Sequence, residues 1–440
     1  MIEDILRKDG SHMDSEKIIR WYSDKIWESL PEHPDRAAKR LRAGMRAEKL
    51  RCAHFQPKCI PAPYRYLRYM ADCDVVDALS HPEHCAWTNI FAPVELLQTF
   101  GLGCISMEAL SSFLSGFYLE DRLIDYTEAQ GISQTLCSYH KNFLAAADTG
   151  LVPTPVLGVT TSMVCDANIC SFRYLHEHCK IDTFVLDVPY VWTQENEDYL
   201  VHQLRELITL LEKKTGRKYD EDALRETLRC ENEARAFLKA FLEKRAVRAY
   251  PNEITLVLFL LFATHLDIGR PWVRDCFRQM SEDIDRYPLS DEKRIFWVHL
   301  TPYAEPTLRE RLNYRDDIAV CCDDFNLDYM DELDTVHPLN ALAKKMIGNI
   351  YNGPFTRKAD ACCDYMQRYN CDAAIELCHW GCKQSAGGAM LLKKRLREIG
   401  KPMLLLDGDA IDRRNCPGGQ IKTRFEAFIE LLEKGEGAAL

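Results

Sequence analysis

The chain has 440 residues, of which 47% are hydrophobic and 28% are charged, and its formal net charge is −11. This acidic balance, with Lys and Arg interspersed among acids, argues against a nucleic-acid surface. No apolar run reaches the length of a membrane span, and no secretory signal is recognisable, so we expect a cytoplasmic protein.

The first 80 residues are predicted to be helical after a short N-terminal stretch. Gly10-Ser-His-Met13 is typical of a cleaved expression tag, so residues 1–12 are predicted to be a tag remnant. Residues 13–80 carry apolar residues at spacings of three and four, which predicts a helical N-terminal segment that packs over another part of the fold.

Strands and helices then alternate twice along the chain. Residues 81–195 combine short apolar segments, including 156–160 and a buried strand ending at Pro189, with helical segments. Residues 196–290 are amphipathic helices and form a predicted connector. Residues 291–440 repeat the strand and helix alternation, with the last strands followed by helices at 385–400 and 422–434. The pattern predicts an α/β protein with two parallel-sheet domains.

Nineteen cysteines are far more than such a chain needs for its core. Disulfides are unexpected in a large chain without a secretory signal. A structural zinc site favours C-x2-C pairs, and the sequence contains none. Iron–sulfur clusters remain, because their cysteine ligands come from separate parts of a fold at variable spacing. We expect reduced thiols in an anaerobic or strongly reducing cytoplasm.

The candidate site residues gather in the second α/β domain. Cys378 and Cys382 straddle the end of a predicted strand, where the amides of the next helix favour an anionic sulfur. His379 and Lys383 beside them are candidate catalytic residues, although a hydrogen-bonded structural role also suits His379. Two adjacent pairs, Cys321-Cys322 and Cys362-Cys363, add candidate ligands, and usually one member of each pair can face a given site. Cys165 is predicted to be core and Cys371 structural.

Common nucleotide and hydrolase motifs are missing from the sequence. There is no G-x-x-x-x-G-K-[ST], no G-x-G-x-x-G after a strand, no G-x-S-x-G and no H-E-x-x-H. These absences favour a metal centre that receives electrons from another protein.

Several long segments are similar to one family. HCAWTNIFAPVELLQTFGLGCISME, TLCSYHKNFL, VCDANICSFRYL and HWGCKQSAGGAMLLKKRLREIGKPMLLLDGDAIDRR resemble the 2-hydroxyacyl-CoA dehydratase and benzoyl-CoA reductase family, which includes the 2-hydroxyglutaryl-CoA dehydratase D-component type. The resemblance implies two flavodoxin-like, Rossmann-like domains with an iron–sulfur cluster between them. It also implies a separate ATP-hydrolysing activator that carries its own [4Fe–4S] cluster.

The family's cluster ligands can be placed on this sequence by motif. In dehydratase subunits three cysteines hold one [4Fe–4S] cluster, and they match Cys85, Cys137 and Cys382. The additional Cys378 and the two adjacent pairs resemble the double-cubane proteins of the family, in which six cysteines hold an [8Fe–9S] unit.

The resemblance therefore implies a homodimeric, ATP-coupled iron–sulfur reductase of a small molecule. Two alternatives stay open. The first is a dehydratase or benzoyl-CoA reductase type subunit with one [4Fe–4S] cluster. The second is a cluster protein that only transfers electrons.

Overall fold

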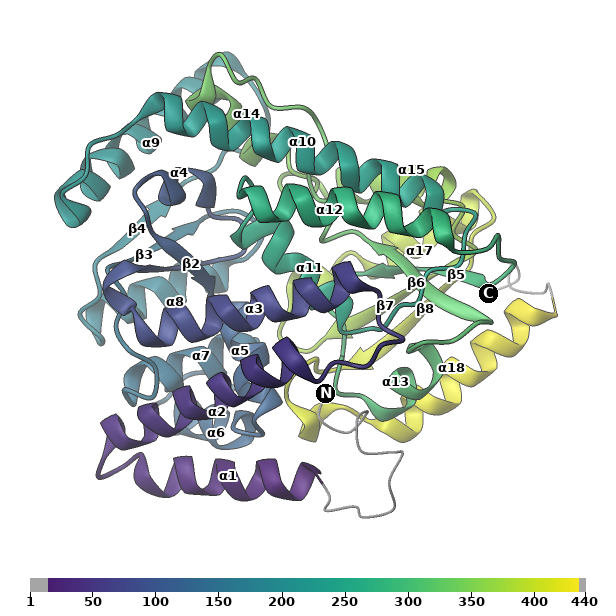
Figure 1. The fold of residues 1–440 in the computed structure, drawn as a ribbon, viewed down its shortest axis with the longest axis horizontal. Coiled ribbons are helices and arrows are strands. Elements are labelled where there is room, and N and C mark those ends of the chain that lie inside the picture. The colour runs from purple at the N-terminus through teal and green to yellow at the C-terminus, as the bar shows by residue number, and fades with distance from the viewer. Residues whose placement is uncertain (1–14, 435–440) are drawn as a thin grey trace.

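The computed structural model describes residues 15–434, so the predicted tag remnant at residues 1–12 lies outside the described residues. Two four-stranded parallel sheets lie side by side, each covered by helices (Figure 1). The α/β class and the two flavodoxin-like domains predicted from the sequence are confirmed. Within the described residues, no helix has both the length and the apolar character needed to cross a bilayer.

Three N-terminal helices pack against the first domain, in purple and blue in Figure 1. They are α1 (Ser15–Ser29), α2 (Pro34–His54) and α3 (Ala62–Ser80). Pro34 occupies the first position of α2, where its missing N–H costs no helical hydrogen bond. Ala37, Leu41 and Met45 recur every four residues on α2 and are buried, so this face packs inward while the charged face meets solvent. Helix α3 in turn lies against β2 of the first sheet.

The first sheet has the order β2-β1-β3-β4 with all strands parallel. Its strands are β1 (Cys85–Thr88), β2 (Gly103–Ser106), β3 (Leu157–Thr161) and β4 (Thr183–Leu186). Its helices are α4 (Val94–Thr99), α5 (Met107–Gly116), α6 (Glu120–Ala129), α7 (Ser138–Asp148) and α8 (Asp166–Glu177). The sequence predicts a buried last strand, but three of its four residues are half-buried because β4 lies at the sheet edge.

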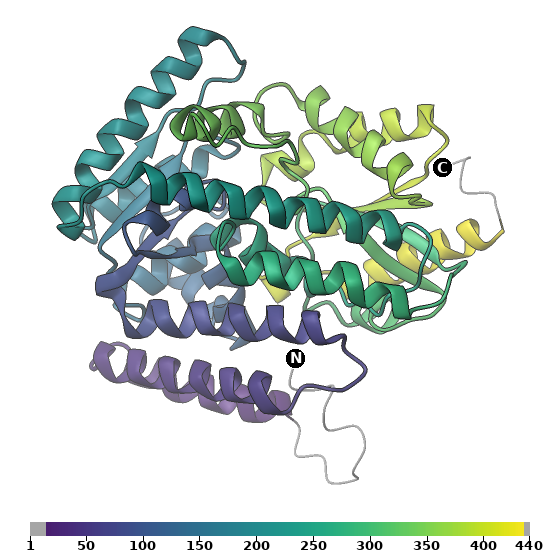
Figure 2. The ribbon, with the colours of Figure 1, turned by 45° about the horizontal axis from the view of Figure 1, so that its top comes forward.

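The connector is a layer of helices. It contains α9 (Gln194–Thr215), α10 (Glu221–Arg245), α11 (Leu256–Leu261), a π-helical turn (Phe262–Leu266) and α12 (Pro271–Asp283). Helices α10 and α12 pack against each other and extend from the first sheet to the second, as the turned view in Figure 2 shows. Their apolar faces cover both domains, so this layer limits how the domains can separate.

The second sheet has the order β6-β5-β7-β8, again all parallel. Its strands are β5 (Lys293–Val298), β6 (Ile318–Asp323), β7 (Ala373–His379) and β8 (Met403–Gly408). Its helices are α13 (Pro306–Leu312), α14 (Pro338–Gly348), α15 (Phe355–Arg368), α16 (Lys383–Ala386), α17 (Ala389–Glu398) and α18 (Gly418–Glu433). In each sheet the strand that comes first in the chain lies inside the sheet and the one that comes second lies at an edge, as in flavodoxin-like folds.

One helix predicted from the sequence is broken in the structure. The pattern predicts a single helix over residues 385–400, but α16 ends at Ala386 and α17 begins at Ala389. A Cβ atom at Gly388 would lie 1.9 Å from the Phe355 ring. The backbone therefore approaches α15 more closely than a continuous helix with side chains would allow.

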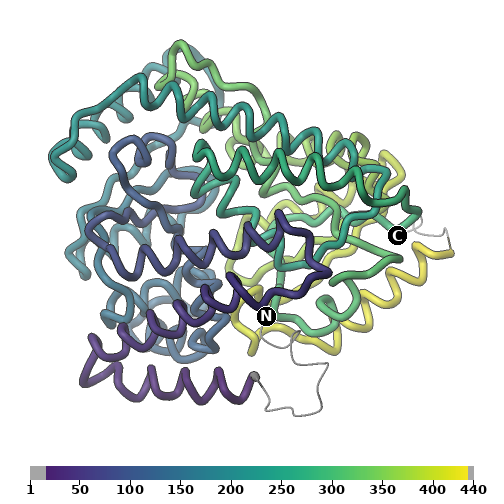
Figure 3. The backbone as a smooth tube through the Cα atoms, viewed as in Figure 1, coloured from purple at the N-terminus to yellow at the C-terminus, as the bar shows by residue number. Residues whose placement is uncertain are grey.

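The tube in Figure 3 shows the chain of the first domain lying beside that of the second. Residues that follow the strands of the two sheets are in contact at the boundary between the domains. Phe91, which follows β1, lies 6.4 Å from Phe325, which follows β6, measured between ring centroids. Ligands of open parallel sheets bind at this end of the strands. The boundary is therefore the place to look for a site.

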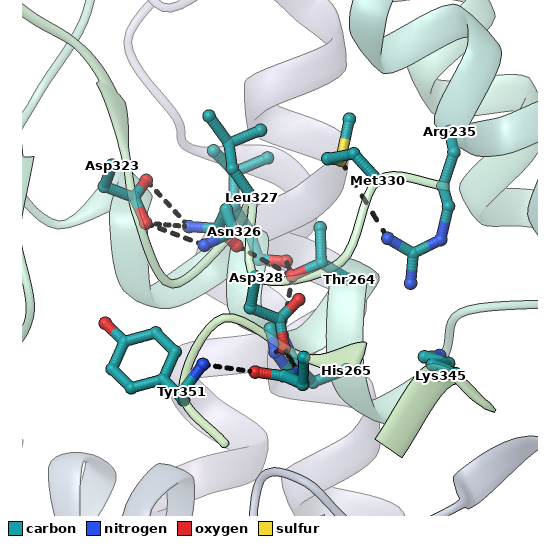
Figure 4. A network of polar contacts seen from close by, with 12 residues as sticks. Arg235, Thr264, His265, Asp323, Asn326, Leu327, Asp328, Met330, Lys345 and Tyr351 are labelled. Atoms are coloured by element: carbon teal, nitrogen blue, oxygen red, sulfur yellow. Dashed lines mark hydrogen bonds and ion pairs between the residues drawn. The ribbon is translucent and has the colours of Figure 1, made fainter. Parts of the chain in front are cut away.

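A buried polar network fixes the loop after β6 at this boundary (Figure 4). The Asn326 amide donates to Asp323, and Thr264 of the π-helical turn donates to Asn326 over 2.7 Å. His265 lies 3.1 Å from Asp328, and Lys345 of α14 forms ion pairs with Glu95 of α4 and Glu231 of α10. These contacts join the first domain, the connector and the second domain.

Candidate metal centre

Three cysteines mark the facing ends of the two sheets. Cys137 precedes α7, Cys165 follows β3 and precedes α8, and Cys382 follows β7 and precedes α16. Each is the residue immediately before a helix. Thiolates are favoured at such positions because the first amides of a helix are free to donate hydrogen bonds.

Burial raises the pKa of each of the three thiols at this boundary. Burial raises the pKa of Cys137 well above its usual range, and the charges of Cys382 and Cys165 raise it further. Burial also raises the pKa of Cys165 to about 12, with the charge of Cys382 adding to the effect. Without a cation the three thiols stay protonated, and bound metal would take the place of their protons.

Each of these sulfurs faces the Nε2 atom of a histidine. The distance is 3.3 Å from Cys137 to His379, 3.1 Å from Cys382 to His299, and 3.8 Å from Cys165 to His140. Burial lowers the pKa of all three imidazoles, that of His140 to about 4. The three rings are therefore neutral at neutral pH.

The tautomer of His379 follows from its other ring nitrogen. The backbone N–H of Ala410 donates to Nδ1 over 3.0 Å, so the ring proton sits on Nε2 and points toward Cys137. Ser138 donates to Asp409 over 2.7 Å beside this pair. A neutral imidazole thus donates to the sulfur, a hydrogen bond of the kind that tunes a cluster's potential.

The turn that carries Cys382 reaches across the domain boundary. Gly381 has a φ of +78°, and a Cβ atom there would lie 2.7 Å from the backbone nitrogen of Cys137. Glycine is required both for the left-handed backbone and for this close approach. The side chain of Gln384 also donates to the carbonyl of Val164 over 2.8 Å, which ties α16 to the loop before Cys165.

Two residues at the same centre have strained backbones. Val164 has a φ of +70° immediately before Cys165, and His299 has a φ of +65° beside Cys382. A β-branched residue in the left-handed region costs about 1–3 kcal/mol. Asp324 accepts the backbone N–H of His299 over 2.7 Å and so helps to hold that conformation.

The spacing of the sulfurs suits a cluster better than a single ion. The three sulfurs are not all within 4.8 Å of one another, whereas one described group elsewhere in the chain is that compact. A single ion draws its ligands together, while each thiolate of a four-iron cluster binds a different iron and stands farther apart. Three thiolates are a donor set that suits an iron–sulfur cluster.

Cys85, the third ligand implied by the family motifs, lies away from this centre. It begins β1, at the end of the strand opposite the domain boundary, and it is buried. Burial raises its pKa to about 12, with the Asp74 carboxylate adding to the effect. Cys165, and not Cys85, lies with Cys137 and Cys382 at the boundary.

The additional candidate ligands are scattered around the second sheet. Cys321 and Cys322 lie in β6, and the Cys322 sulfur is 3.7 Å from that of Cys371. Cys378 lies beside Asp407 of β8. The two cysteines of α15 differ in exposure, because Cys362 is buried and Cys363 is half-buried.

The two candidate catalytic residues both lie at the centre. His379 is buried against Cys137, as described above, whereas Lys383 is the exposed first residue of α16, next to Cys382 in the chain. The sequence did not place Cys165 among the candidates, because VCDANICSF has a helical pattern, although it follows the strand at 157–161 just as Cys382 follows β7. His140 and His299 carry no sequence signal, since the fold alone brings them to the sulfurs.

Comparison with known proteins places the chain in a family. The model of the 2-hydroxyglutaryl-CoA dehydratase D-component matches residues 89–432, which is more than half of the chain. The chain belongs to this family. The resemblance inferred from the sequence motifs is confirmed, and the matched region of the chain includes Cys137, Cys165 and Cys382.

Curated proteins similar to this chain are subunits of dehydratases and of a reductase. The chain is 23% identical to the (R)-phenyllactyl-CoA dehydratase alpha subunit of Clostridium sporogenes, over 81% of this chain and 91% of the relative. It is 23% identical to a benzoyl-CoA reductase subunit of Thauera aromatica, over 71% and 80%. It is 21% identical to the lactoyl-CoA dehydratase subunit alpha of Anaerotignum propionicum, over 91% and 99%.

Proposed function

We propose that this chain is the cluster-binding subunit of an ATP-coupled iron–sulfur enzyme that acts on an acyl-CoA thioester. Cys137, Cys165 and Cys382 hold one [4Fe–4S] cluster between the two α/β domains. The observation that carries the proposal is the convergence of these three thiols, each with a histidine partner, at the facing sheet ends.

The bound cluster would supply low-potential one-electron chemistry and an iron with no cysteine ligand. The chain's own residues set its surroundings. His379 donates its Nε2–H to Cys137, and buried aromatic rings shield the Cys382 side from water. His299 stacks on Phe325 with 4.7 Å between ring centroids, and Tyr351 stacks on Phe325 at 4.9 Å.

A cavity borders on two residues that contact this centre. Its volume is about 1190 Å³, and Asp409 and Ala410, which hold Ser138 and His379, form part of its wall. Arg20 and Arg413 also line it. The size suits a cofactor-sized ligand such as a coenzyme A ester. The two guanidinium groups already pair with the Glu16 and Glu120 carboxylates.

Electrons would come from a separate ATP-hydrolysing protein with its own [4Fe–4S] cluster, as the family resemblance implies. A reducing cytoplasm belongs to the same proposal, because free thiols at this density survive best there. The relatives are named as subunits, which favours a different second subunit over a homodimer.

Matched cysteine variants test the proposal on anaerobically purified protein. The wild-type chain should contain about four irons and four sulfides, and Cys165→Ser should lose most of them. Cys85→Ser should keep them, because Cys85 lies at the far end of β1. Iron loss in Cys85→Ser with full iron in Cys165→Ser would reject this ligand set in favour of the motif-based one.

The double-cubane reductase implied by the sequence is the second candidate. One observation favours it: Lys358 lies one turn before Cys362 on α15 and pairs with Asp324 over 2.9 Å. Asp324 also accepts the backbone N–H of His299, which faces Cys382, so one of the additional thiols is connected to the centre. This candidate predicts about eight irons and nine sulfides per chain, reduction of a small molecule, and a homodimer. Iron should then fall in Cys378→Ser but not in Cys371→Ser.

A turnover assay distinguishes the two candidate enzymes from a protein that only transfers electrons. The cluster-loaded chain is incubated with the activator, ATP and a 2-hydroxyacyl-CoA, with and without the second subunit. Loss of water from the thioester supports the dehydratase proposal. Oxidation of the activator without any change in substrate supports the electron-transfer alternative.

A further inference from the structure

A second group of metal-binding side chains lies between α2 and α3, outside the thiol centre. Glu48 and Cys52 of α2 and Asp72 of α3 place one ligand atom each within 4.8 Å of the others. All three side chains are buried, with exposed fractions of 9%, 4% and 4%. Within residues 15–434 this is the most compact such group.

The two helices hold these ligand atoms rigidly. Glu48 and Cys52 are four residues apart, so they lie on one face of α2, and the Cys52 sulfur is 3.7 Å from Glu48 Oε1. Helix α3 packs along α2 and brings Asp72 to the same face. A site built from two packed helices keeps its geometry better than one built on loops.

One oxygen in the group has no partner. Oδ2 of Asp72 is buried and accepts no hydrogen bond from any protein atom. Leaving a buried carboxylate oxygen unsatisfied is costly, and native proteins usually provide a partner. The Asp72 carboxylate that carries this oxygen belongs to the same compact group as the Cys52 sulfur and the Glu48 carboxylate.

We propose that Glu48, Cys52 and Asp72 bind a divalent transition cation of the zinc class. A thiolate with two carboxylates suits a cation of borderline softness, whereas Mg²⁺ and Ca²⁺ prefer oxygen ligands alone. Binding releases the thiol proton of Cys52 to solvent, since the thiolate is the ligand. The site is separate from the proposed cluster and does not depend on it.

The surrounding charges are compatible with a cation. Arg51 donates to both Glu48 oxygens, over 2.7 and 2.5 Å, and lies 3.3 Å from the Cys52 sulfur. Its single positive charge and a divalent cation together balance the three anionic ligands. Arg68 is 3.3 Å from Glu253, so that pair adds no net charge. Arg51 thus orients two ligands, as hydrogen-bonded groups around metal sites commonly do.

Three protein ligands leave the fourth position of a tetrahedral cation open. Glu48 and Arg51 line the cavity of about 1190 Å³, so water or a ligand in the cavity can reach that position. The cation would also join α2 to α3, two helices of the segment that covers the first domain.

Anomalous diffraction locates the metal directly. Crystals of the complete chain, with its iron centre loaded, are soaked in zinc chloride and measured on both sides of the zinc absorption edge. Iron contributes almost equally on both sides, so a difference peak reports zinc alone. The proposal expects a peak between α2 and α3, and no zinc there at saturation would overturn it.

Solution measurements with matched variants test whether these side chains are the ligands. Wild-type protein should retain about one zinc per chain after gel filtration, while Cys52→Ser and Asp72→Asn should retain almost none and keep their iron. Cys230→Ser, at a buried cysteine of α10, should bind zinc like the wild type. Zinc should raise the melting temperature of the wild type but not of Asp72→Asn. Unchanged zinc retention in both ligand variants would reject the site.

Discussion

Cys137 and His379 meet across the boundary between the two α/β domains, with 3.3 Å between Sγ and Nε2. Cys137 precedes a helix of the first domain and His379 ends a strand of the second. The contact therefore exists only when the domains are assembled, and it couples the proposed cluster site to their relative position.

Replacing His379 with Leu should lower the reduction potential of the cluster. In the wild type the N–H donor of His379 stabilises the reduced cluster, which is more negative, more than the oxidised one. If this hydrogen bond is about 1 kcal/mol stronger in the reduced state, its loss shifts the potential by on the order of 40 mV for one electron. A redox titration followed by electron paramagnetic resonance measures the shift. His379→Gln, which keeps an N–H donor, should restore part of it. An unchanged potential in His379→Leu at full iron content would argue against this hydrogen bond.

Gly381→Ala should disturb the centre more than an equivalent change elsewhere. Gly381 and Gly400 both have left-handed backbones, with φ of +78° and +72°, but a Cβ atom clashes with Cys137 only at Gly381. Gly400→Ala should cost about 1–2 kcal/mol from the backbone alone. Gly381→Ala should cost more and should also lose iron. Urea unfolding and iron analysis compare the two, and equal values would mean that the turn can shift away from Cys137.

Lys345→Met should destabilise the fold strongly. The Lys345 ammonium lies between the Glu95 and Glu231 carboxylates, which are 1% and 0% exposed. Its removal leaves two buried carboxylates facing each other without their shared cation, and breaking a buried ion pair costs about 3–5 kcal/mol. Lys218→Met, which breaks the exposed pair with Glu212, should cost less than about 1 kcal/mol. Similar urea midpoints for the two variants would contradict this account.

Glu376→Gln should change how stability depends on pH. Burial raises the pKa of Glu376 from its ordinary value of 4.5 to about 8, with Lys358 opposing and Asp324 adding to the effect. The folded state therefore binds a proton that the unfolded state releases between these values. The stability that this proton contributes is complete below pH 4.5 and is lost as pH rises toward 8, by at most about 1.4 kcal/mol per pH unit.

The neutral Gln side chain cannot lose that proton. Glu376→Gln should therefore gain stability relative to the wild type as pH rises from 5.5 to 8, and the difference should become constant above pH 8. Urea unfolding at a series of pH values measures it. A difference that does not vary with pH would mean that Glu376 titrates normally in the folded protein.

Much of the fold could be predicted from the sequence because it depends on local patterns. Apolar spacing identified the helices, and the alternation of strands with helices indicated two parallel sheets. The broken helix at 387–388 could not be predicted, because the break depends on Phe355, a residue more than thirty positions away. The edge position of β4 was missed for a similar reason, since strand order is decided by packing.

The sequence by itself determined the family of this protein and the end of the sheets at which to look for a site. Cysteine composition indicated iron and sulfur, and strand direction placed Cys382 at the carboxyl end of β7. Only the tertiary structure decided which thiols meet. Cys85 and Cys165 are both near strands of one sheet. Cys85 begins β1 whereas Cys165 follows β3, so they lie at opposite ends of these parallel strands. The contacts between these sulfurs and histidines depend on how the two domains pack, and no local sequence pattern encodes that packing.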